Sequence, residues 1–195
     1  AQEDDRVPHL YFTECAGDIT AGKYNDGDRR NRELFAQRML LAMEESERET
    51  RTVPVDKVEW RSVPLNLPPR DDTTIAQLQE RIADTTRTHK ERQRDAMELS
   101  YAERWHRPIM INALHIDDSV CIVQLPGEPF IAYQLLAQRL RPDAFVVVPA
   151  YGDCSPGYIC VDGSFEEGGY EPSDAFVTAA AEPLLEPPGV WSVFQ

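Results

Sequence analysis

A single carboxylate, Glu128, stands at a position where chemistry is common in α/β proteins. It follows the apolar run Val120–Leu125 and the strand-breaking pair Pro126-Gly127. In open α/β sheets, ligands bind at the edge where strands end, so a carboxylate there could contact a ligand. The alternative is a residue in the first turn of a helix, stabilised by the positive end of the helix dipole. The local sequence alone favours this second interpretation.

Two tyrosines follow in a segment rich in small residues. The loop 151–158 contains Gly152, Pro156 and Gly157, and it ends at Tyr158. A loop of this kind after a buried strand is typical of an active-site loop. Tyr170 lies twelve residues further on. Taken singly, each tyrosine is more typical of a core edge whose hydroxyl group is hydrogen-bonded.

A third loop, Cys15–Asp28, carries one hydroxyl residue, Thr20, between small residues. Its glycine spacing does not match the phosphate-binding loop of nucleotide-binding proteins. By itself the loop reads as a turn-rich connection. However, three loops that each follow a predicted strand, each with polar residues among glycines, together favour an active site.

The histidines and cysteines of this chain do not form a recognisable metal motif. Neither an HxH nor an HExxH spacing occurs, and each histidine is more typical of a structural residue (His9, His89, His106, His115). A catalytic zinc ion normally has three or more protein ligands, usually including histidine. The cysteines form no CxxC pair (Cys15, Cys121, Cys154, Cys160). We expect free buried thiols, with a Cys154–Cys160 bridge as the alternative.

The composition limits the possible partners. The chain has 195 residues, 42% of them hydrophobic, which is enough for a substantial core. Its net charge of −14 argues against nucleic acid and against anionic lipid surfaces. No apolar run approaches the roughly 20 residues of a membrane-spanning helix. The opening segment Ala1–Arg6 is polar and charged, so we expect no signal peptide within this chain.

The hydrophobic pattern predicts an α/β fold with a mixed sheet flanked by helices. A hairpin with its turn at Asp117-Asp118 gives the sheet its antiparallel part. A helix over 29–49 carries an apolar stripe, and another helix is expected after the capping residues Asp71 and Asp72. The polar stretch 83–94 is a solvated helix or a hinge. The expected strands are 7–13, 53–65, 109–116, 119–125 and 144–149, and the remaining expected helices are 128–140 and one near 174–185.

Three motifs resemble the catalytic domain of the neutral, non-lysosomal ceramidases, and most closely their bacterial relatives. The family has an LPGE strand end, a YGDxxPGYI loop and a following EEGGYEP segment, which here are Leu125–Glu128, Tyr151–Ile159 and Glu166–Pro172. Ala16–Gly27 is similar to the family's AGD loop. The order and spacing agree, and the match corresponds to the second half of the family's catalytic domain. The resemblance therefore implies that residues 1–195 are part of a larger domain.

The resemblance also implies roles for four residues. Glu128 and Tyr158 fall on two zinc ligands, and Tyr170 falls on a tyrosine that polarises the scissile amide bond. Thr20 falls on the family's essential serine, which it replaces with a bulkier hydroxyl residue. The implied activity is zinc-dependent hydrolysis of an amide, with a small molecule or a sphingolipid such as ceramide as substrate. Zinc would activate water and polarise the carbonyl group.

The family's two zinc-binding histidines come from the first half of its domain, and no residue here matches them. We therefore expect the remaining Zn²⁺ ligands outside this chain, weak zinc binding by the chain alone and no activity in isolation. The resemblance implies an extracellular or periplasmic location. The alternative, favoured by Thr20 and the missing histidines, is a non-catalytic relative whose pocket binds a ligand or a partner.

Overall fold

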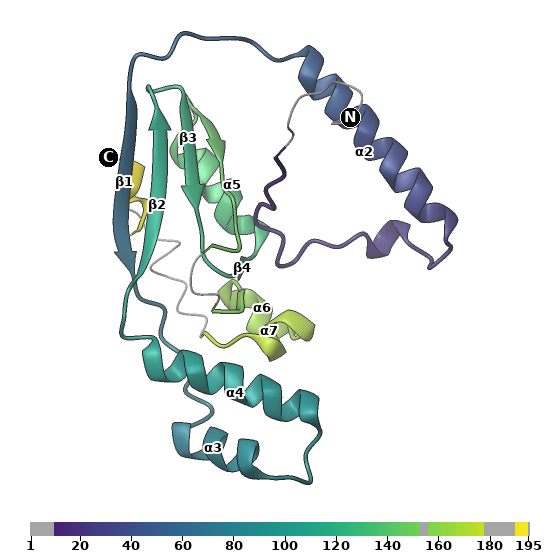
Figure 1. Cartoon of the computed structure of the whole chain (residues 1–195), viewed down its shortest axis with the longest axis vertical. Helices are drawn as coiled ribbons and strands as arrows, with labels where there is room; N and C mark the ends of the chain where they lie inside the picture. The colour runs from purple at the N-terminus through teal and green to yellow at the C-terminus, as the bar shows by residue number, and fades with distance from the viewer. Residues whose placement is uncertain (1–9, 153–155, 178–189, 195) are drawn as a thin grey trace.

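A four-stranded mixed sheet forms the centre of the computed structural model, which describes residues 10–152, 156–177 and 190–194 (Figure 1). The strand order is β1-β2-β3-β5. β2 pairs antiparallel with both β1 and β3, whereas β5 pairs parallel with β3. The strands are β1 (Val58–Leu65), β2 (Ile109–Ile116), β3 (Val120–Gln124) and β5 (Phe145–Val147). The mixed sheet with its helices confirms the predicted α/β class.

Asp117 fixes one end of this sheet. It lies in the β2–β3 turn with φ 48°, a left-handed conformation that aspartate tolerates better than most residues. Its carboxylate accepts a hydrogen bond of 2.8 Å from the Lys57 backbone N–H, and its own N–H donates to the Lys57 carbonyl oxygen at 2.9 Å. The predicted hairpin turn is therefore confirmed, and the same residue also anchors the start of β1.

One face of the sheet is buried beneath α5 (Ile131–Leu140) and the 3-10 helix η2 (Val190–Phe194). The α5 helix connects β3 to the parallel strand β5, as a crossover connection requires. Tyr133 on α5 is fully buried, and its hydroxyl donates to the Cys160 carbonyl oxygen at 2.8 Å. On η2, the Val193 carbonyl oxygen lies 3.0 Å from His115 Nε2. This side of the sheet contains the hydrophobic core.

Two short strands form a second, parallel pair, which lies below the main sheet in the view of Figure 1. They are β4 (Glu128–Pro129) and β6 (Tyr158–Ile159), and the helices α6 (Asp162–Glu167) and α7 (Tyr170–Asp174) follow β6. Figure 1 shows α6 and α7 between the sheet and the helix pair α3–α4.

That helix pair consists of α3 (Ile75–Ala83) and α4 (His89–Arg104). The polar stretch 83–94 spans the end of α3, the turn and the start of α4. The expectation that Asp71 or Asp72 caps α3 is wrong. Thr74 is the N-cap because it forms a reciprocal capping box with Gln77, whereas Asp72 forms an ion pair with Arg70.

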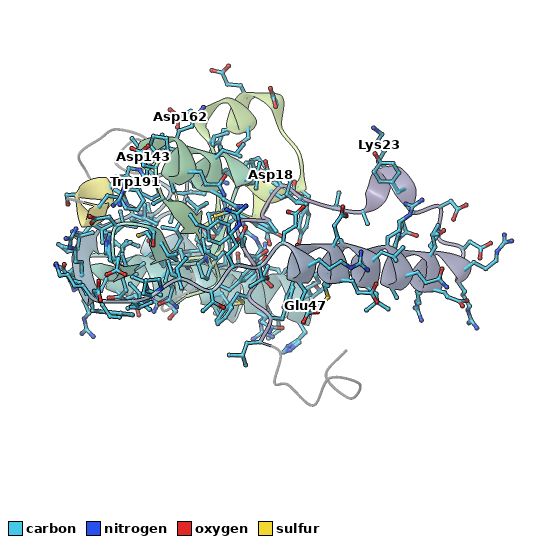
Figure 2. All side chains as sticks on the ribbon, turned by 90° about the horizontal axis from the view of Figure 1, so that it is seen from above. Asp18, Lys23, Glu47, Asp143, Asp162 and Trp191 are labelled. Carbon is cyan, nitrogen blue, oxygen red and sulfur yellow. The ribbon has the colours of Figure 1, made fainter. Side chains whose placement is uncertain are left out.

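The predicted helix over 29–49 is confirmed as α2 (Arg30–Arg48), which follows the short 3-10 helix η1 (Gly22–Tyr24). None of its side chains is buried. Figure 2 shows that α2, with Glu47 labelled near its C-terminal end, projects away from the rest of the protein.

Several predicted boundaries are wrong. The described part of the expected strand 7–13 is irregular, because only one isolated bridge, Glu14 with Pro149, pairs this region with another segment. The expected strand 53–65 begins only at Val58. The helix expected from Glu128 begins at Ile131. The helix expected near 174–185 is absent over Ala175–Val177, and its remainder lies outside the described residues.

Leu78 is the buried residue of α3, with 1% of its surface exposed, whereas Ile75 on the same helix is 44% exposed. Replacing Leu78 with alanine should leave a cavity between α3 and α4 and destabilise the protein by about 3 kcal/mol. The Ile75→Ala control should cost less than about 1 kcal/mol. Urea unfolding of both variants measures the difference, and equal losses would contradict the described packing.

Candidate functional site

Glu128 and Tyr158 are direct neighbours across the β4–β6 strand pair. The strands run parallel with Glu128 opposite Tyr158, and the Glu128 backbone N–H donates to the Gly157 carbonyl oxygen at 2.9 Å. Residues paired in register point to the same face of a sheet. A carboxylate and a phenol thirty positions apart in the chain are therefore brought side by side.

The interpretation of Glu128 as a first-turn helix residue is wrong. The α5 helix begins at Ile131, and the residue that precedes it, Phe130, is extended with φ −66° and ψ 154°. Glu128 lies in the short strand before this point, and its side chain is partly exposed. Its carboxylate is therefore available for contacts outside the helix.

Tyr170, at the start of α7, joins the same cluster. Its ring meets the ring of Tyr158 edge to face, with centroids 6.0 Å apart and planes at 80°. This is a favourable aromatic geometry. The Tyr170 side chain is 62% exposed, so its hydroxyl group can be reached from solvent.

Tyr151 is a further member of the cluster to which the sequence analysis gave no role. Its hydroxyl lies 3.5 Å from Glu128 Oε2, a long hydrogen bond. Tyr151 has φ 58°, a left-handed conformation that is uncommon for a bulky residue. The signal was present in the sequence, because Tyr151 opens the YGDxxPGYI motif, but only the backbone turn aims its side chain at Glu128.

Glycines allow the close packing that holds β4 in place. Gly127 has φ +62°, and a Cβ atom there would lie 2.5 Å from the Gly157 carbonyl oxygen. Gly17, from the loop that carries Thr20, packs against the backbone of Glu128, and its N–H donates to the Pro129 carbonyl oxygen at 3.0 Å. The three predicted loops therefore converge on β4.

Asp18, in the same loop as Gly17, adds a contact to the segment that follows β4. Its carboxylate accepts a hydrogen bond of 2.8 Å from the Ile131 backbone N–H, at the start of α5. Thr20, two residues later, is exposed, and its Oγ1 accepts from the Gly22 N–H at 3.3 Å. The structure thus brings Glu128, Tyr158 and Tyr170 together, whereas the hydrogen bond described for Thr20 is local to its own loop.

The local electrostatics keep the phenols protonated when no cation is present. Burial, followed by the nearby Glu128 carboxylate and Tyr170, raises the pKa of Tyr158 to about 12. Burial and Glu128 likewise raise the pKa of Tyr151. A bound cation would reverse this preference by stabilising a phenolate.

The cluster supplies two oxygen donors suited to a zinc ion, Glu128 and Tyr158. Carboxylate oxygens are common zinc ligands, and a zinc site normally has at least three protein ligands. Within residues 10–152, 156–177 and 190–194, no group of three or more His, Cys, Asp or Glu side chains could hold a metal ion. Of the histidines, His115 is buried in the main sheet, and His89 and His106 are exposed on or after α4.

A groove of about 520 Å³ lies beside Tyr170, between α4 and α7. Arg94 fixes α7 along this groove, because its Nε donates to the Asp174 carboxylate at 2.5 Å and its guanidinium lies over the Phe176 ring. The other lining residues are Lys90, Glu91, Gln93 and Met97. The groove places an open, partly apolar surface next to the candidate site.

The thiols and the membrane prediction can also be examined. Cys15, Cys121 and Cys160 are free and buried, as expected. The alternative Cys154–Cys160 bridge involves Cys154, which lies outside the described residues. No helix in the described part of the chain is long and apolar enough to cross a membrane.

Comparisons with models of protein families, with curated proteins and with solved structures found no match for this chain.

The packing at Gly127 gives a test of the site's architecture. Gly127→Ala should destabilise the protein by about 3 kcal/mol or more, because it adds both backbone strain and a clash with Pro156 and Gly157, directly before β6. The matched control is Gly27→Ala, since Gly27 also has positive φ (+86°) but has nothing within 4 Å of the added atom. That control should lose only about 1 kcal/mol. Chemical denaturation that gives equal losses would contradict the close β4–β6 contact.

The raised pKa of Tyr158 gives a second test. In metal-free protein, ultraviolet difference titration against Tyr158→Phe should show that this phenol ionises near pH 12. Glu128→Gln should lower the Tyr158 pKa, since it removes a negative charge that opposes the phenolate. The exposed Glu33→Gln on α2 serves as the control and should change nothing. An unchanged Tyr158 pKa in Glu128→Gln would show that the phenol and the carboxylate are not adjacent.

Proposed function

We propose that this chain supplies Glu128 and Tyr158 as two ligands of a zinc-dependent amide hydrolase site of the neutral ceramidase type. The observation that carries the proposal is the cross-strand pairing of these two residues, with Tyr170 against the Tyr158 ring. The motif resemblance selected these positions from sequence alone, and they come from segments far apart in the chain.

Each residue has a distinct role in this proposal. The Glu128 carboxylate and the Tyr158 oxygen hold the cation, which when bound lowers the pKa of a water molecule and polarises the substrate carbonyl. The exposed Tyr170 hydroxyl donates a hydrogen bond to the amide carbonyl oxygen, where negative charge develops. Tyr151, within reach of the Glu128 carboxylate, orients it.

The proposed substrate is a small-molecule or lipid amide. An amide with an apolar portion suits the groove beside Tyr170, which Met97 and Phe176 line together with the stems of longer side chains. The remaining zinc ligands, expected to be histidines, would come from outside this chain. We therefore propose that the isolated chain binds zinc weakly and does not hydrolyse amides.

Zinc titration of the metal-free chain tests the ligand assignment. Calorimetry should detect weak binding, and Glu128→Gln or Tyr158→Phe should weaken it by about tenfold, or about 1.4 kcal/mol. The control variants Glu33→Gln and Tyr24→Phe change exposed residues elsewhere and should bind as the unmodified chain does. Tight stoichiometric binding through Glu128 and Tyr158 would contradict an incomplete site. Unchanged binding by both variants would remove the metal role altogether.

A second candidate function is a non-catalytic pocket that binds a ligand or a partner. The observation that favours it is the local hydrogen bond of Thr20, where the family has its essential serine. If a longer protein that contains this chain hydrolyses an N-acyl amide, Glu128→Gln should abolish its turnover. Full turnover in that variant would favour the non-catalytic function.

A further inference from the structure

A small cavity lies where α4 ends and the chain turns into β2, at the lower end of the main sheet in the view of Figure 1. Its volume is about 160 Å³. Pockets for drug-sized ligands measure roughly 300–1,000 Å³, so this cavity suits a smaller molecule. The described residues that line it are Tyr101, Arg104, Trp105, Arg107, Pro108 and Ile109.

Two arginines give this cavity a positive charge. Arg104 and Arg107 belong to its lining, and none of the other described lining residues is acidic. Glu103, the acidic neighbour of Arg104 in sequence, is exposed and does not belong to that lining. The chain as a whole carries a net charge of −14, so a cavity with two cations and no described carboxylate is a local exception. Such a lining favours an anionic ligand.

Arg104 is held in place without using its N–H donors. Its guanidinium carbon lies over the Tyr101 ring, 5.8 Å from the ring centroid, which is a cation–π contact. Tyr101 is itself fixed, because it is buried and its hydroxyl donates to the Leu67 carbonyl oxygen at 2.7 Å. The Arg104 Nε atom is buried, yet it has no hydrogen-bond partner among the described residues.

This missing partner points to a ligand. A buried N–H group without an acceptor costs free energy, and native structures rarely leave one. The negative end of the α4 dipole explains why an arginine occurs near the helix C-terminus, but it does not explain a buried donor that is unpaired. A carboxylate can accept hydrogen bonds from Nε and from a terminal guanidinium nitrogen at once. Arg104 is only partly buried, so it can turn this edge toward the cavity.

The remaining lining indicates the rest of the ligand. Ile109 is 8% exposed and forms an apolar wall, and Pro108 adds to it. Trp105 is 37% exposed, so part of its indole ring is open to a ligand. A bare inorganic anion would leave these apolar surfaces in contact with water, whereas an aromatic ring would cover them and pack on the indole.

We propose that this cavity binds a small aromatic monocarboxylate. The carboxylate pairs with Arg104 and Arg107, and the ring packs against Trp105 and Ile109. The cavity lies at the C-terminal end of α4, whereas the groove beside Tyr170 is lined by the first part of the same helix. The inference therefore does not depend on the proposed activity.

NMR titration of the unmodified, ¹⁵N-labelled chain with benzoate tests the proposal. The Trp105 indole N–H and Arg104 Nε–H signals should shift together, with a dissociation constant of about 1 mM, which is usual for so small a ligand. Benzamide has the same ring without the charge, and inorganic phosphate has charge without the ring, so each should bind at least tenfold more weakly. The proposal is overturned if benzoate moves neither signal far above this concentration, or if either comparison compound binds as tightly as benzoate.

Charge-neutralising variants test the two arginines separately. Arg104→Gln and Arg107→Gln should each weaken benzoate binding at least tenfold, because each removes half of the positive charge of the cavity. The matched control is Arg139→Gln, which removes the same charge from an exposed position on α5 and should leave binding unchanged. Equal losses in all three variants would overturn the proposal, since benzoate would then respond only to the overall charge of the chain.

Discussion

The parallel pairing of β4 with β6 is the contact on which the candidate site depends. It consists of only two residue pairs, yet it puts Glu128 opposite Tyr158 and turns two distant motifs into one cluster. So short a strand pair has little stability of its own. Close backbone packing holds it in place: a Cβ atom added at Gly127 would clash with the Gly157 carbonyl oxygen, and one added at Gly17 would clash with the Glu128 carbonyl oxygen.

This strand pair also connects the main sheet to the helices α6, α7 and α4. On one side, the chain enters α5 directly after β4, and α5 covers the core face of the main sheet. On the other side, β6 leads to α6 and α7, and Arg94 ties α7 to α4 through the Asp174 carboxylate. Tyr170 is therefore positioned by α7, which Arg94 ties to α4, whereas Glu128 is positioned by the β4–β6 strand pair. A change in the docking of α4 on α7 would move one part of the cluster relative to the other.

The sequence predicted the parts of the fold that depend on local pattern. The hairpin β2–β3 and the helix α2 follow from alternation, turn residues and helical periodicity, and both are present. The expected strand at residues 7–13 had the right composition, but a strand also needs a partner, which no local pattern reveals. The helix predicted from Glu128 started too early because β4 exists only through its pairing with β6. Likewise, Tyr151 reaches Glu128 through a backbone turn that its neighbours in sequence do not specify.

The central claim is that Glu128 and Tyr158 bind one zinc ion. Anomalous diffraction at the zinc absorption edge, from crystals of the chain soaked in zinc, tests it most directly. The account predicts a peak at about 2.0–2.2 Å from an oxygen atom of the Glu128 carboxylate, with the Tyr158 oxygen as a second ligand. A zinc peak that lies only at other residues, with no density between Glu128 and Tyr158, would contradict it.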